Sequence, residues 1–202
     1  MVIKCLCNER DFNVLTLVLD DVPLVLCNKA VFLLYGNNIK DFVNPLIGLT
    51  DSSLKYPDIL SNLPICKDTG KKYSRGDFVN KVYSVLAAIA PYSEYLEGSQ
   101  TSFSQSKVTN NMVVTLVQGL TIKESSRTCI LALTTCSLEM PKTMYKNIDK
   151  VLLSFSKISA TKHVATPMLE FLSTLIRLPE VFCSFIGKFR IWPLGRDSRQ
   201  VS

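Results

Sequence analysis

The stretch CILALTTCSLEMPKTMYKNIDKVLLSF, residues 129–155, decides the fold class. In its first half, apolar residues follow the i, i+3, i+4, i+7 spacing of one helix face, at Cys129, Ala132, Leu133 and Cys136. In its second half, they return every three to four positions, at Met144, Ile148, Val151, Leu152 and Phe155. Pro141 stands between the halves, where it ends one helix and suits the first turn of the next. The stretch therefore predicts two helices joined by a tight turn.

The same period continues on both sides of this pair. The helix before it carries an apolar stripe of Val113, Leu116, Val117 and Leu120, and the helix after it carries Leu169, Leu172 and Ile176 before Pro179. A further helix opens with Asp77 as its cap and runs to Pro91. Helices of about 12–18 residues joined by turns of about two to six residues are typical of antiparallel helix pairs. We therefore predict an all-α fold of antiparallel helix pairs stacked as a HEAT- or armadillo-like α-solenoid, although no clean sequence repeat is visible.

The first part of the chain is less regular. We expect a helix over residues 9–19, a break at residues 20–23, and a second helix over residues 22–35. The second run could also form two strands, but its length and its helical neighbours favour a helix. Prolines at 45, 57 and 64 predict breaks in two short helices within residues 39–63, and we expect loops over residues 67–76 and 98–106.

Composition limits the class of protein. Of the 202 residues, 47% are apolar and 20% are charged, which is typical of a folded domain and not of a disordered chain. Most of the net charge of +6 comes from basic residues within 67–75 and within the tail at 188–199, without the basic and aromatic stripe of a nucleic-acid module. Seven irregularly spaced cysteines fit a reducing compartment better than a disulfide framework. No apolar run approaches the ~20 residues of a membrane span, so we expect a soluble, cytoplasmic chain.

The search for catalytic or metal-binding residues predicts none. The one histidine, His163, lies at a helix start, where a solvated side chain is expected rather than a general base. The pair Cys5 and Cys7 has the wrong spacing for a structural zinc site, so we expect buried thiols. The stretch Gly70-Lys71-Lys72 lacks the upstream glycine and the following serine or threonine of a phosphate-binding loop. We therefore assign no catalytic, cofactor-binding or metal-binding residue.

Two further sets of residues have weaker functional readings. Arg75-Gly76-Asp77 spells an integrin-binding tripeptide, but Asp77 is better explained as a helix cap. Two pairs of glutamates could serve as an acid and a base, Glu94 with Glu97 or Glu139 with Glu170. Exposed glutamates on helices are the simpler interpretation. Four lysines on the later helices are candidate contacts for a partner: Lys142, Lys146, Lys150 and Lys157. The simpler interpretation is that they form a solvated helix face.

Several segments resemble the central helical region of the tuberin family. The strongest are CSLEMP at 136–141, ISAT at 158–161 and LEFLSTLIRLP at 169–179. Looser likenesses are ERDFNVLTLVL at 9–19, QGL at 118–120 and CILAL at 129–133. The resemblance covers about residues 1–188, and residues 189–202 match nothing in it, so we expect a solenoid segment over 1–188 and a disordered basic tail over 189–202.

The resemblance implies a function that composition alone does not. In the tuberin family a helical solenoid binds hamartin, and a separate domain activates GTP hydrolysis by the small GTPase Rheb and so restrains TOR signalling. We expect this chain to lack that domain and to act as a non-catalytic scaffold that contacts hamartin and neighbouring solenoid repeats. The alternative is a truncated isoform or gene fragment without independent function. The residues leave open which helical face meets a partner and what the oligomeric state is.

Overall fold

The computed structural model describes residues 2–9, 11–28, 39–55, 74–97, 103–158 and 161–178, together with Cys183. Every regular element in these ranges is a helix. The α-helices are α1 (Val2–Asn8), α2 (Phe12–Cys27), α4 (Lys40–Lys55), α5 (Arg75–Ile89), α6 (Ser93–Glu97), α7 (Phe103–Gly119), α8 (Ser126–Glu139), α9 (Pro141–Phe155) and α10 (Lys162–Ile176), and a short 3-10 helix, η2 (Ala90–Tyr92), links α5 to α6.

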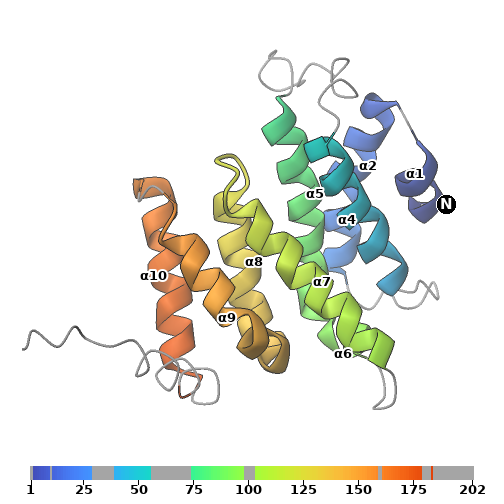
Figure 1. The fold of residues 1–202 in the computed structure, drawn as a ribbon. Helices are drawn as coiled ribbons and strands as arrows, with labels where there is room; N and C mark the ends of the chain where they lie inside the picture. Colours follow the sequence, from blue (N-terminus) through green and yellow to red (C-terminus); the bar gives the residue numbers. More distant parts are fainter. Residues whose placement is uncertain are drawn as a thin grey trace, which may run out of the picture.

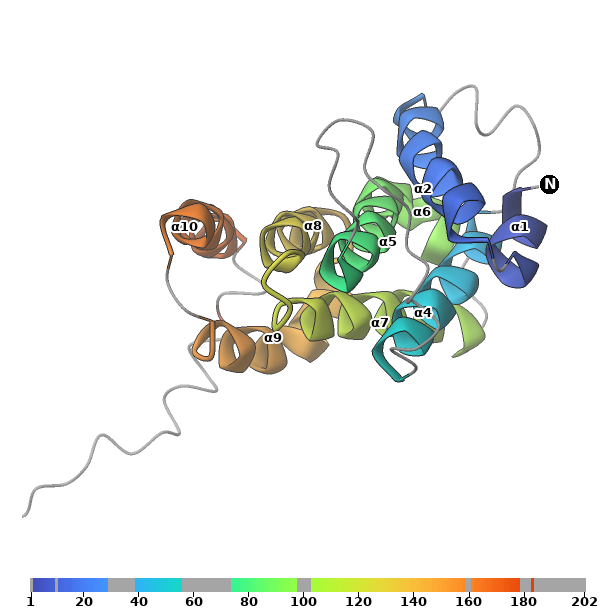
Figure 2. The same cartoon turned by 90° about the horizontal axis from the view of Figure 1, so that it is seen from above.

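The long helices form two layers (Figures 1 and 2). One layer holds α2, α5, α8 and α10, each packed against the next. The other holds α1, α4, α7 and α9, with α4 beside α7 and α7 beside α9. Each consecutive pair of helices gives one member to each layer, which is how antiparallel pairs stack in a solenoid. The predicted all-α, solenoid-like fold is confirmed.

Helix α5 lies at the centre of the stack, between α2 and α8 in its own layer and against α4 and α7 of the other. Its buried side chains form one broad face of the helix, at Phe78, Val79, Val82, Tyr83, Val85, Leu86 and Ile89. The helix begins at Arg75, two residues earlier than predicted, because Ser74 is the N-cap. The Ser74 hydroxyl accepts from the Asp77 amide at 3.1 Å, and the Asp77 carboxylate accepts from the Ser74 amide at 2.9 Å. Asp77 thus shares a capping box instead of capping alone.

Two predicted helix breaks are wrong, because α2 runs through Pro23 and α4 runs through Pro45. A proline inside a helix removes one backbone hydrogen bond and costs about 3 kcal/mol. Burial on both sides of each proline offsets that cost. In α2 the buried residues flanking the proline are Leu19, Val22 and Leu26, and in α4 they are Phe42, Val43 and Leu46.

The connections between helices agree in part with those predicted from the sequence. The α8–α9 pair is joined by Met140 alone, with Pro141 in the first turn of α9, as predicted. The loop predicted over 98–106 is too long, because α7 already begins at Phe103. The predictions for residues 29–38, for the breaks at Pro57 and Pro64, for the loop at 67–73 and for the tail at 189–202 lie outside the described residues.

Helix α10 forms where expected, but the buried face is not the predicted one. The side chains that pack on α8 are those of Val164, Pro167, Phe171 and Leu175. The Phe171 ring meets the ring of Phe155 edge to face, with centroids 5.1 Å apart, and so ties α10 to α9. The predicted stripe faces solvent instead: Leu169 is 67% exposed and Ile176 is 62% exposed.

Candidate protein-interaction surface

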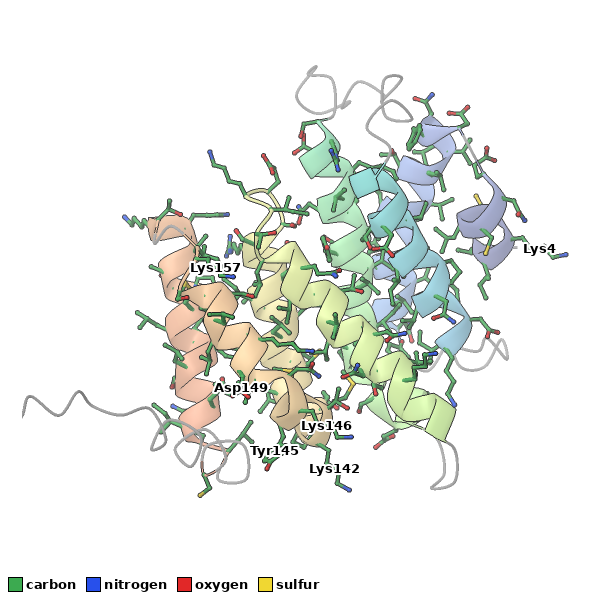
Figure 3. All side chains as sticks on the ribbon, in the orientation of Figure 1. Lys4, Lys142, Tyr145, Lys146, Asp149 and Lys157 are labelled. Atoms are coloured by element: carbon green, nitrogen blue, oxygen red, sulfur yellow. The ribbon has the colours of Figure 1, made fainter. Side chains whose placement is uncertain are left out.

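The four candidate lysines of the sequence are all exposed. Lys142, Lys146 and Lys150 lie on the outer face of α9, and Lys157 follows the end of that helix. Figure 3 shows Lys142, Tyr145 and Lys146 together where α9 begins, with Lys157 at its opposite end. Asp149 is an exposed acidic side chain on the same face. The face is therefore exposed and carries more basic than acidic side chains.

Buried polar contacts hold α9 against α7. The Asn147 amide group donates to the Asn110 side-chain oxygen at 2.8 Å and to the Thr143 carbonyl at 3.0 Å. The Thr109 and Thr143 hydroxyls lie 3.4 Å apart in the same interface. Because buried polar pairs tolerate few alternative arrangements, these contacts fix the register of α9 on α7. Sequence reasoning missed them, although an asparagine between the apolar positions Met144 and Ile148 was a usable signal.

An apolar row lies on the exposed surface of α10. Leu169, Leu172 and Ile176 occupy i, i+3 and i+7 positions, so they line one side of the helix. The neighbouring helix α8 exposes Leu131 and Leu138. We call these five side chains the outer row. Single exposed leucines are ordinary, but a helical row of them is typical of a surface that another helix covers.

Cysteine burial only partly follows the sequence prediction. Cys129 and Cys136 are fully buried on one face of α8, as predicted. Burial raises the pKa of both thiols, that of Cys136 to about 12, so both stay neutral and packed as small apolar groups. Cys7 is exposed and Cys5 is half-buried, so the expectation of buried thiols fails at the chain start.

The remaining candidates for chemistry whose side chains are described are all exposed. His163 is exposed near the start of α10. Glu94, Glu139 and Glu170 are exposed and lie on three different helices, and the side chain of Glu97 is outside the description. Within the described ranges no three histidine, cysteine or acidic side chains gather as metal ligands. None of the described helices is both long enough and apolar enough to cross a membrane.

Tyr83 is a buried polar group that the sequence did not single out. Its ring lies at the contact of α5 with Gly119 of α7 and Cys129 of α8, and its hydroxyl has no hydrogen-bond partner among the described residues. Burial, followed by the nearby Cys129, raises the pKa of the Tyr83 hydroxyl and keeps it protonated. Its place in a close three-helix contact makes it part of the packing.

The fold defines a class: a solenoid-like protein of stacked helix pairs, all of whose described regular elements are helices. The family model for tuberin matches residues 1–191. The chain therefore belongs to the tuberin family. No solved structure matches the chain.

Proposed function

We propose that this chain is a non-catalytic scaffold segment that binds the coiled coil of hamartin. The observation that carries the proposal is the outer row, a set of exposed apolar side chains on the neighbouring helices α8 and α10 in a member of the tuberin family. Its residues repeat along the helix axis, which suits a long apolar helix laid against them. In the cytoplasm such a scaffold serves the complex that activates GTP hydrolysis by Rheb and restrains TOR signalling, with the activation carried out by a domain outside this chain.

The α9 lysines support the same proposal in a secondary way. Coiled coils expose acidic side chains beside their apolar seam, and exposed lysines elsewhere on the chain attract them during encounter. Exposed charges of this kind change association rates more than affinity, and salt screens them. We therefore assign most of the binding affinity to the outer row, and an increase in the association rate to the lysines.

The test is co-purification of the 202-residue chain with the hamartin coiled coil, followed by size-exclusion chromatography with light scattering. We expect a joint complex that survives moderate salt, because apolar contacts carry it. Absence of a complex even at low salt would reject the scaffold proposal and favour a truncated product that folds without binding hamartin. Far-UV circular dichroism on the same samples separates loss of binding from loss of fold.

A further inference from the structure

A cavity of about 880 Å³ opens beside the start of α10, away from the outer row. The turn between α7 and α8 forms one wall, and the end of α9 with the first turn of α10 forms the other. Three apolar side chains line part of it, those of Leu120, Ile158 and Val164. Three basic side chains also line it, those of Lys123, Lys157 and His163. A cavity with both kinds of lining suits a ligand that is anionic at one point and apolar beside it.

The charge in this cavity is not balanced from within the described part of the chain. Lys123 and Lys157 form no ion pair there, and both are exposed. The one acidic lining residue is Glu124. Its side chain lies directly against Gly76, in the first turn of α5, so its negative charge also faces the start of that helix. The other charged lining residues, Lys123 and Lys157, are basic, so an entering anion meets their positive charge.

Two helices start at the cavity and reinforce that charge. Ser126 of α8 and His163 of α10 both line it, and Figure 1 shows the two helices beginning at the same edge of the stack. Neither helix has an acidic residue in its first turn, and neither N-cap side chain, of Ser125 or Thr161, accepts a hydrogen bond from the helix. The Ser126 N–H already donates to the Ile122 carbonyl at 2.9 Å, and the Val164 N–H donates to the Thr161 carbonyl at 2.9 Å. The other first-turn N–H groups and the positive dipole ends can still interact with a ligand.

We propose that this cavity binds a phosphorylated serine or threonine side chain of a partner peptide. The phosphate group lies between Lys123, Lys157 and His163 at the start of α10, where basic side chains and helix N–H groups supply charge-assisted hydrogen bonds. An apolar side chain next to the phosphorylated residue packs on Leu120, Ile158 and Val164. The cavity is far larger than a phosphate ion, and its apolar part has no use for one, so a peptide is the better occupant. This site is separate from the hamartin surface and does not depend on it.

The experiment is a titration of the ¹⁵N-labelled full chain with the peptide acetyl-Ala-Leu-phosphoserine-Leu-Ala-amide, followed by backbone amide shifts. We expect shifts at residues 123–127, 157–158 and 161–164, and little change along α9, which ends at Phe155. The Lys123→Gln/Lys157→Gln double variant should bind about tenfold more weakly or worse, since each lost charge-assisted contact removes a strong bond. The Lys142→Gln/Lys146→Gln variant is the matched control, with the same charge loss on α9, and should bind as the unchanged chain does.

Three results would overturn the proposal. Equal binding of the same peptide without its phosphate would remove the role of the basic residues. Equal binding of inorganic phosphate, with shifts at the same amides, would show a site for a free anion only. Equal weakening in both double variants would show non-specific attraction to a basic protein. Circular dichroism of each variant confirms that the helices are retained.

Discussion

Helix α5 and helix α10 belong to the same layer and have similar apolar content, yet their surroundings differ. Seven side chains of α5 are buried on one broad face, because helices of both layers pack on it. In α10 the buried face is confined to Val164, Pro167, Phe171 and Leu175. The α10 residues of the outer row are partly or largely exposed to solvent. The difference shows that apolar residues at helical spacing can form the core, as in α5, or an exposed surface, as in α10. Each prediction below compares a buried or capped position with a matched one that lacks that role.

The largest expected difference is between Leu86→Ala in α5 and Leu169→Ala in α10. Leu86 is fully buried, so its truncation leaves a cavity and should lower the free energy of unfolding by about 2–5 kcal/mol. Leu169 is 67% exposed, so its truncation should change that free energy by no more than about 0.5 kcal/mol. Chemical denaturation followed by circular dichroism measures both. Similar losses in the two variants would contradict the assigned faces of α10.

The next comparison concerns how closely α7 approaches α5. A methyl group at Gly119 would lie 2.5 Å from the Cys129 sulfur and 2.5 Å from the Tyr83 ring. Gly119→Ala should therefore destabilise the protein by about 1–3 kcal/mol through overpacking. Gly48→Ala in α4 is the control, because nothing lies within 4 Å of the added methyl.

Gly48→Ala should stabilise the protein by about 0.5–1 kcal/mol, since alanine favours an exposed helix interior more than glycine does. Thermal melts of both glycine variants give the two signs directly. A stabilising Gly119→Ala would mean that α7 is not pressed against Tyr83.

A smaller effect separates the starts of the two helices. Ser74→Ala removes a capping box from α5 and should cost about 1 kcal/mol. Thr161→Ala at the start of α10 removes no side-chain cap and should cost clearly less. Urea denaturation resolves the difference. If the Thr161 variant lost as much stability as the Ser74 variant, the threonine would be capping α10 after all.

The smallest expected change is at two buried tyrosines. The Tyr92 hydroxyl donates to the Leu26 carbonyl at 2.6 Å, so Tyr92→Phe should cost about 0.5–1.5 kcal/mol. The Tyr83 hydroxyl has no partner in the described ranges, so Tyr83→Phe should leave stability unchanged or slightly higher. Denaturant midpoints of the two variants test this ordering, and a larger loss for Tyr83→Phe would reveal a hydrogen bond that the hydroxyl makes.

The sequence was sufficient where local signals and packing agree. Pro141 and the two apolar stripes around it predicted the α8–α9 pair to within a few residues, and the buried pair Cys129 and Cys136 followed from spacing alone. Pro23 and Pro45 misled, because a local breaker signal carries no information about burial on the far side of the break.

The surface was harder to predict than the core. Periodicity shows that α10 has an apolar side, but it cannot tell a side that packs on α8 from one that faces solvent. The Asn110–Asn147 contact and the cavity at His163 both join segments that are far apart in the chain, so no local pattern announces them.

The most direct test of the account is the affinity of the chain for the hamartin coiled coil with the outer row altered. Leu169→Ser/Ile176→Ser should leave unfolding unchanged within about 1 kcal/mol, because both side chains are exposed. The same variant should lose most of its binding in isothermal titration calorimetry, while Lys142→Gln/Lys146→Gln loses mainly at low salt. Full binding by the serine variant, with its fold intact, would contradict the outer row as the docking surface.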